Sequence, residues 1–116
     1  MRSILFILCS LLSLNAAAYG YISGAKVVQV RIDQGGQGMI TFDKAIGGGN
    51  GTTRPGCVNA AYINMFSFNT NTAAGRAIMA MALAAKATGS PVEAVGLNAC
   101  TIYSNIVEDI SYGIIQ

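Results

Sequence analysis

The stretch TAAGRAIMAMALAAKATG, from Thr72 to Gly89, decides the fold class, because it predicts a helix. Between Ala73 and Ala87 nearly every residue is apolar, and no proline or β-branched run interrupts, so helix propensity is high. Thr72 can cap the first turn, with Asn71 as the rival for that position, and Gly89 can take the left-handed conformation after the last turn. Both ends of the helix are therefore marked in the sequence.

One face of this helix is predicted to lie on a sheet. The residues that share this face at helical spacing are Ala74, Ile78, Met81, Ala82 and Ala85. Met79 and Leu83 are predicted to point away from it. Three interpretations of Met79 and Leu83 are open: a loop covers them, they are exposed to solvent, or they contact the same face of other copies of the chain. In the third case the two residues are oligomer contacts.

The amino-terminal residues predict a secretory signal peptide over residues 1–18. Arg2 precedes an apolar run, and three alanines stand just before Tyr19. The run is too short to span a bilayer, and no later stretch is long and apolar enough. We therefore expect one domain over residues 19–116, located in the periplasm or secreted, without stable membrane insertion.

Two cysteines remain after the predicted cleavage, and we expect Cys57 and Cys100 to form a disulfide. In the chain-entropy model a loop of that length stabilises the fold by about 4 kcal/mol. The alternative is a pair of free or redox thiols. The chain has neither a CxxC motif nor a histidine to activate a thiolate.

Five segments carry strand patterns, with the helix after the third. Two of them form a predicted hairpin around a glycine-rich turn, and in the last one Ile110, Tyr112 and Ile114 are predicted to share a face. The glycine-rich stretch at 44–56 predicts a long loop; a phosphate cradle would need a GK[ST] motif, which is missing. The predicted strands are Lys26–Asp33, Met39–Asp43, Ala60–Phe68, Pro91–Gly96 and Asp109–Gln116.

This element order predicts an α+β fold that is mainly β. The specific expectation is a small, five-stranded, OB-like Greek-key barrel with one helix between strands three and four. The same order also permits an open sheet with one helix across it.

At this point the sequence resembles a known family. The run AGRAIMAMALAAKATGSPVEAVG, a following cysteine and the closing EDISYGIIQ resemble small exported bacterial proteins related to the B subunit of subtilase cytotoxin. The resemblance covers Lys26 to Gln116. It implies an OB-type barrel, a binding role without catalysis and, as in the toxin subunit, glycan recognition within a ring of five.

The resemblance also suggests where a glycan would bind. The toxin subunit's pocket lies near the loop after its first strand, which corresponds here to residues 33–37, although DQGGQ shows no matching motif. Asp33, Gln34 and Gln37 are therefore candidate polar contacts with a ligand. The alternative is a solvated hairpin turn.

The residue types argue against catalysis. Without histidine there is no Ser-His-Asp or Cys-His system, and cysteines held in a bridge cannot bind a metal, so no metal or cofactor is expected. A glycosidase needs two facing carboxylates, but the adjacent Glu108 and Asp109 would point to opposite faces of a strand. We expect a protein that is not an enzyme, with a carboxylate-dependent hydrolase as the weaker alternative.

The charge balance excludes one class of partner. Without Arg2, six of the seven Lys and Arg residues remain against five Asp and Glu, scattered along the chain, so nucleic acid is not an expected partner. The sequence thus predicts an exported binding module for a glycan or protein ligand, and the resemblance implies a homo-oligomeric ring as a possible assembly. The alternative is an envelope protein with a structural or inhibitory role.

Overall fold

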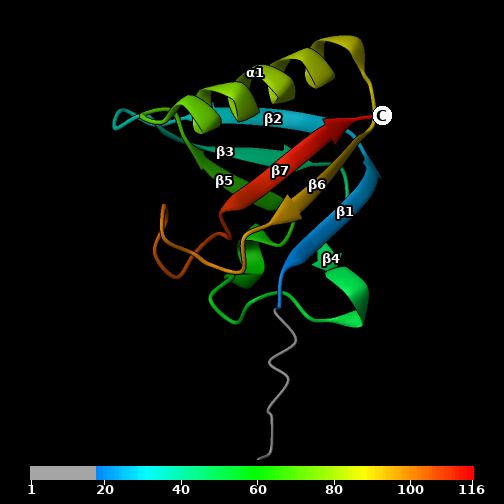
Figure 1. Ribbon diagram of the computed structural model, residues 1–116, viewed down its shortest axis with the longest axis vertical. Helices are drawn as coiled ribbons and strands as arrows, with labels where there is room; N and C mark the ends of the chain where they lie inside the picture. Colours follow the sequence, from blue (N-terminus) through cyan, green and yellow to red (C-terminus); the bar gives the residue numbers. More distant parts are fainter. Residues whose placement is uncertain (1–17) are drawn as a thin grey trace, which may run out of the picture.

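The computed structural model describes residues 18–116, so all of the predicted signal peptide except Ala18 lies outside the described residues (Figure 1). Seven strands and one α-helix are present in this part of the chain, together with two short 3-10 turns. The strands and the helix are β1 (Gly20–Ala25), β2 (Val27–Ile32), β3 (Gln37–Phe42), β4 (Gly47–Gly48), β5 (Met65–Asn69), α1 (Ala73–Thr88), β6 (Val92–Gly96) and β7 (Ile110–Ile115). The 3-10 turns are η1 (Gly49–Gly51) and η2 (Ala60–Tyr62).

The predicted helix and both of its ends are confirmed. The Thr72 hydroxyl accepts a hydrogen bond from the Gly75 N–H at 3.0 Å, so Thr72 rather than Asn71 is the cap. Gly89 has φ 66° and ψ 22°, and its N–H donates to the carbonyls of Ala85 and Lys86. The left-handed glycine closes the last turn, as the sequence predicts.

The strands form two antiparallel sheets, with the orders β4-β1-β6-β7 and β2-β3-β5. The α+β class with mainly β structure is therefore confirmed. The expected five-stranded closed barrel is not what residues 18–116 form: seven strands lie in two separate sheets, joined at one edge by a bridge between Ser67 and Asp109. In Figure 1 the sheets lie one behind the other, and α1 crosses one end of the pair.

Two strands were not predicted. β1 lies in a stretch with two glycines, and Gly24 has φ 64° where the pairing with β6 shifts register between Ile22 and Ala25. Gly20 and Ile22 are nevertheless buried at alternate positions, and Ala25 is buried after the register shift. β4 is only two glycines long, inside the segment predicted as a loop. Glycine-rich strands show little of the alternation on which strand prediction depends.

The core fills the space between the sheets. The Phe42 and Phe66 rings meet edge to face, with centroids 6.1 Å apart and planes at 82°. Aliphatic side chains from the facing sheet, including Ile22 and Val92, pack against the same cluster. The helix adds small residues to this core, so its backbone lies close to the strands.

The buried stripe of α1 is rotated relative to the prediction. Ala82 and Ala85 are buried as expected, but Ala74 is exposed and Gly75 is buried instead. A Cβ on Gly75 would overlap the carbonyl of Asn69, so this turn approaches the end of β5 at a point where only glycine fits. The rotation also brings Met79 against the core, which corrects its predicted outward position.

The predicted disulfide is present, between Cys57 and Cys100. It joins the long segment after β4 to the segment after β6, which are 43 residues apart in sequence. Within residues 18–116, no helix is both long and apolar enough to cross a bilayer.

Candidate binding site

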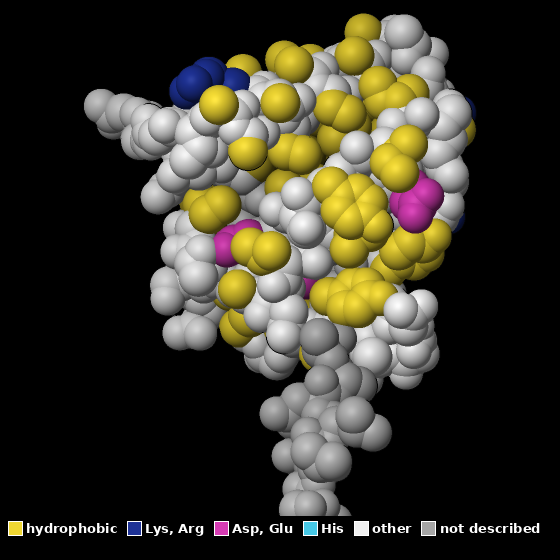
Figure 2. Space-filling model, viewed as in Figure 1, with side chains coloured by type: hydrophobic (Ala, Val, Ile, Leu, Met, Phe, Trp, Pro, Cys, Tyr) yellow, Lys and Arg dark blue, Asp and Glu magenta, His cyan; other side chains and the backbone are white. Residues whose placement is uncertain are grey.

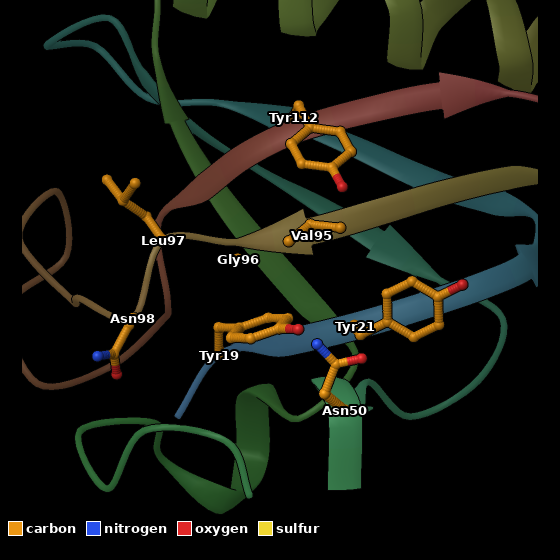
Figure 3. Close-up of a pocket in the computed structure, with 8 residues that line it drawn as sticks. All are labelled: Tyr19, Tyr21, Asn50, Val95, Gly96, Leu97, Asn98 and Tyr112. Atoms are coloured by element: carbon orange, nitrogen blue, oxygen red, sulfur yellow. The ribbon is translucent and has the colours of Figure 1, made fainter. Parts of the chain in front are cut away.

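A hollow of about 650 Å³ lies on the outward face of the sheet β4-β1-β6-β7 (Figure 3). In Figure 2 this face carries a gathering of apolar and aromatic side chains over β1, β6 and β7. We call this feature the tyrosine hollow. Its lining residues are Tyr19, Tyr21, Asn50, Val95, Gly96, Leu97, Asn98 and Tyr112.

Strand register places the aromatic walls. Tyr21 of β1 is paired with Val95 of β6, and Val95 is paired with Tyr112 of β7. Residues directly opposite one another in a sheet point to the same face, so the two tyrosines stand on either side of a small valine. Tyr19, just before β1, extends the wall on the β1 side (Figure 3).

Ile110 and Tyr112 face opposite sides of the sheet because of a register shift. The pairing of β6 and β7 is irregular between Val95 and Gly96, and Gly96 is paired with Ile110. Ile110 therefore packs against the core, while Tyr112 and Ile114 are each 48% exposed. The prediction that these three residues share one face is wrong, because a bulge changes the alternation along the strand.

Two amide side chains complete the hollow. Asn50, in η1, has φ 50° and lies between Tyr19 and Tyr21, whereas Asn98, after β6, has φ 60° and lies beside Leu97 (Figure 3). Both residues take the left-handed conformation, which asparagine tolerates better than most residues. Each amide group can donate and accept hydrogen bonds.

A buried carboxylate beneath the hollow forms hydrogen bonds with the segments that line it. Glu108 is fully buried, and its oxygens accept from the N–H groups of Gly20 at 3.0 Å and Asn98 at 3.1 Å. A Cβ on Gly20 or Gly96 would overlap the Glu108 carboxylate, which explains glycine at both positions. Glu108 thus links the start of β1 to the segment after β6.

Arg54 supplies the positive charge that compensates the buried negative charge of Glu108. Its Nη2 lies 3.2 Å from Oε1 of Glu108, and its guanidinium lies 5.4 Å from the centroid of Phe66. Burial lowers the pKa of Arg54 from its ordinary value, and the negative charge of Glu108 opposes this shift. The pair ties the loop that carries Asn50 to the same carboxylate as β1.

The hollow is lined by neutral polar groups and apolar groups. Its eight lining residues offer aromatic faces, hydroxyls and amides, and none of them is charged. In the described part of the chain no group of three His, Cys, Asp or Glu residues could hold a metal ion. The site therefore presents neutral hydrogen-bonding groups around an apolar floor.

Of the predicted ligand contacts, Asp33 and Gln34 lie in the turn between β2 and β3, and Gln37 is the first residue of β3. None of the three lines the tyrosine hollow. Asp33 accepts a hydrogen bond from Arg31 Nε at 2.8 Å and another from the Tyr103 hydroxyl. These two bonds lower the pKa of Asp33, that from Tyr103 more than that from Arg31. Burial first, and then the bond to Asp33, raise the pKa of Tyr103 to about 12.

The second buried carboxylate, that of Asp109, is bonded to the segment after β6. Asp109, also buried, accepts from the N–H groups of Thr101 and Ile102 at 3.1 Å, and from the Ser67 hydroxyl at 3.2 Å. Glu108 and Asp109 therefore serve separate sets of donors. This arrangement does not resemble two carboxylates facing each other across a cleft.

The candidate oligomer contacts differ in their surroundings. Met79 is partly buried against the core, whereas Leu83 is 48% exposed on the outer side of α1. Contact with another copy through Leu83 stays a prediction, which light scattering on the wild type and Leu83→Glu would test.

A second, smaller hollow of about 250 Å³ lies between the start of α1 and β7. It shares Leu97 with the tyrosine hollow, and its lining includes Ile78, Ile102 and Ile110. Leu97, 57% exposed, therefore stands on the border between the two hollows.

Sequence reasoning missed the tyrosine hollow. Tyr19 and Tyr21 precede the first predicted strand, and Tyr112 was assigned to a face shared with Ile110. The spacing of Tyr19 and Tyr21, two residues apart, is the one sequence signal for an aromatic strand face. Comparison with protein-family models, curated proteins and solved structures finds no match.

Proposed function

We propose that this chain is an exported, non-catalytic binding module that recognises a glycan in the tyrosine hollow. The observation that carries the proposal is the placement of Tyr21 and Tyr112 on opposite sides of Val95, with amide groups nearby. No step of the proposal requires a catalytic residue or a cofactor.

The chemistry of a sugar matches this lining. A pyranose ring has an apolar C–H face and a rim of hydroxyls. A tyrosine ring offers a broad apolar surface with a polar tip, and asparagine can both donate to and accept from hydroxyls. The volume of about 650 Å³ is within the range of about 300–1,000 Å³ that is typical of ligand sites.

The walls of the hollow are held in place before a ligand arrives. The Tyr19 carbonyl accepts from Gly49 N–H at 2.9 Å, and a Cβ on Gly49 would overlap the Tyr19 ring. Glu108 fixes Gly20 and Asn98 from below. Binding to a preorganised site loses less conformational entropy, which favours affinity.

The resemblance to proteins related to the B subunit of subtilase cytotoxin supports the same class of ligand. Kinship with that family and its ring assembly form part of this proposal. β5 and β6 correspond to the predicted third and fourth strands, and α1 lies between them. This position of the helix is compatible with the proposed kinship. The disulfide fits an oxidising compartment, periplasmic or secreted.

A protein ligand is the second candidate, and Leu97 favours it. This side chain is 57% exposed and borders both hollows, so an extended apolar segment could contact the two together. A structural or inhibitory role in the cell envelope would act through such a contact.

A glycan array followed by calorimetric titration tests the proposal. We expect Tyr112→Ala and Tyr21→Ala each to weaken binding about tenfold or more, as is usual for aromatic residues at the centre of a site. Tyr62→Ala is the matched control, because Tyr62 does not line the hollow. Thermal unfolding of each variant separates lost contacts from lost structure.

Three results would count against this function. Unchanged affinity in both tyrosine variants would put the site elsewhere, with the Asp33–Gln37 turn as the next position to test. Capture of a protein that depends on Leu97, with no glycan bound, would favour the second candidate. Turnover of a bound glycan that Glu108→Gln abolishes would favour the hydrolase.

A further inference from the structure

Three asparagines in the described part of the chain have a left-handed backbone. Asn50 has φ 50°, Asn98 has φ 60° and Asn105 has φ 58°, and all three are exposed. They differ in the next residue, which is glycine after Asn50, alanine after Asn98 and isoleucine after Asn105. This difference affects how fast each of them can react with its own backbone.

An asparagine can cyclise when the backbone nitrogen of the next residue reaches its side-chain amide carbon. A side chain on that next residue hinders the approach, and glycine removes the hindrance. Gly51 has φ 72°, and a Cβ built on it would meet no heavy atom within 4 Å. The side of Gly51 on which a side chain would stand is therefore open.

Other asparagine side chains are held by hydrogen bonds. Asn59 and Asn69 accept from the N–H groups of Ala61 and Asn71, at 2.9 Å and 3.0 Å. Asn71 donates to the Gly35 carbonyl at 2.9 Å, and Asn64 donates to the Phe42 carbonyl at 3.3 Å. Such bonds restrict the rotation that cyclisation needs, so these residues are expected to be protected.

We propose that Asn50 is a site of spontaneous deamidation that alters the tyrosine hollow with time. The Gly51 nitrogen attacks Cγ of Asn50 and loses its proton, the side-chain nitrogen leaves as ammonia, and a cyclic imide forms. Water then opens the imide to aspartate or isoaspartate. The net reaction consumes one water and releases one ammonia, with no oxidant, enzyme or cofactor.

The product differs from asparagine in charge and in backbone length. A carboxylate replaces a neutral amide in a hollow whose lining is otherwise uncharged. Isoaspartate also lengthens the backbone within η1, where Thr52 N–H binds the Gly49 carbonyl at 2.9 Å. The effect on ligand binding rests on the proposed function, whereas the chemical change does not.

Mass spectrometry of the aged protein tests the chemistry. Freshly purified protein is kept folded in mildly alkaline buffer at physiological temperature, digested at intervals and compared peptide by peptide. We expect the amide-to-acid mass change to appear first at Asn50, with Asn98 and Asn105 as internal controls. Ala99→Gly places a glycine after Asn98, and we expect it to speed the reaction at that residue.

A second measurement tests the consequence for binding. On an array of neutral oligosaccharides, the signal of the aged wild type should fall in proportion to the fraction converted, while a wild-type sample kept cold, in which the Asn50 amide is retained, keeps its signal. An Asn50 amide that lasts as long as those of Asn98 and Asn105 would overturn the inference. Conversion with an unchanged array signal would overturn its link to the hollow. An absent signal in fresh protein would instead overturn the proposed function, since the mass measurement stands alone.

Discussion

A fully buried carboxylate, Glu108, organises the candidate site at the level of single residues. It accepts hydrogen bonds from two backbone N–H groups and from Arg54, so its charge is both paired and hydrogen-bonded. Buried charges persist in proteins mainly under these two conditions. Nothing in the sequence distinguishes Glu108 from an exposed glutamate, because its partners are up to 88 residues away.

Tyr103 and Asp33 give the first prediction, which concerns alkaline pH. The pKa of Tyr103 is raised to about 12, from an ordinary value of 10.0. Between these values the folded protein keeps a proton that the unfolded chain has lost, so the free energy of unfolding falls as pH rises from about 10 to about 12. We expect this part of the alkaline destabilisation to be missing from Tyr103→Phe.

Urea unfolding of the wild type and Tyr103→Phe at a series of pH values measures the difference. Ultraviolet absorbance of tyrosinate provides an independent check, since a titration step near pH 12 should vanish in the variant. Parallel loss of stability in both proteins across this range would contradict the prediction. Asp33, whose pKa is lowered, should add stability above its ordinary pKa and lose it as pH falls through the lowered value.

At the level of elements, α1 shows what sequence can and cannot determine. Thr72 and Gly89 mark its ends by local chemistry, and local chemistry is fully present in the sequence. Which face of α1 is buried, however, depends on the strand against which the helix packs. Gly75 lies against the Asn69 carbonyl at the end of β5, and this contact rotates the stripe so that Ala74 is exposed.

The second prediction reverses the usual helix preference at Gly75. Alanine is normally better than glycine in a helix by about 1 kcal/mol. At position 75, however, the added methyl would overlap the Asn69 carbonyl, so we expect Gly75→Ala to destabilise the protein by about 1–3 kcal/mol. Urea unfolding at equilibrium provides the measurement.

Ala80→Gly is the matched control for this substitution. Ala80 is exposed in the middle of α1, so its replacement should cost only the propensity difference of about 1 kcal/mol. Gly75→Ala as stable as wild type, or more so, would mean that the helix can move away from β5 without loss.

The strands were predicted where side chains alternate and missed where glycine interrupts. β2 lies within its predicted segment, because branched residues alternate with polar ones there, whereas β3 begins at Gln37, two residues before the predicted start. β1 was missed, since Gly20 and Gly24 leave few side chains to show a pattern. The tyrosine hollow was missed for the same reason, because Tyr21 lies in β1. Only the pairing of β1 with β6 places Tyr21 opposite Val95 and near Tyr112.

At the scale of the whole molecule, long-range links hold the loops around two small sheets. The Cys57–Cys100 disulfide and the Arg54–Glu108 ion pair both connect the segment between β4 and β5 with the segment between β6 and β7. These segments carry little regular structure of their own. The disulfide and the ion pair therefore add to the backbone hydrogen bond from Asn59 N–H to the Ile106 carbonyl, which joins the same two segments.

The third prediction concerns the disulfide. Cys57→Ser combined with Cys100→Ser opens a loop of 43 residues and should lower the free energy of unfolding by roughly 2–4 kcal/mol. Denaturant unfolding of the variant and the oxidised wild type measures the loss. A difference below about 1 kcal/mol would show that the unfolded chain gains little freedom when the bridge is absent.

Tyr19 directly precedes β1 and forms a wall of the hollow, while the Gln116 side chain accepts a hydrogen bond from Gly24 N–H, near the other end of β1, at 2.9 Å. Any purification tag or carrier fused ahead of Tyr19 therefore joins the protein at the rim of its own candidate site. Immobilisation through that end would obstruct the ligand, whereas attachment after Gln116 would leave the rim open. A negative screen with an amino-terminal fusion should thus be repeated with the tag moved to the carboxyl end.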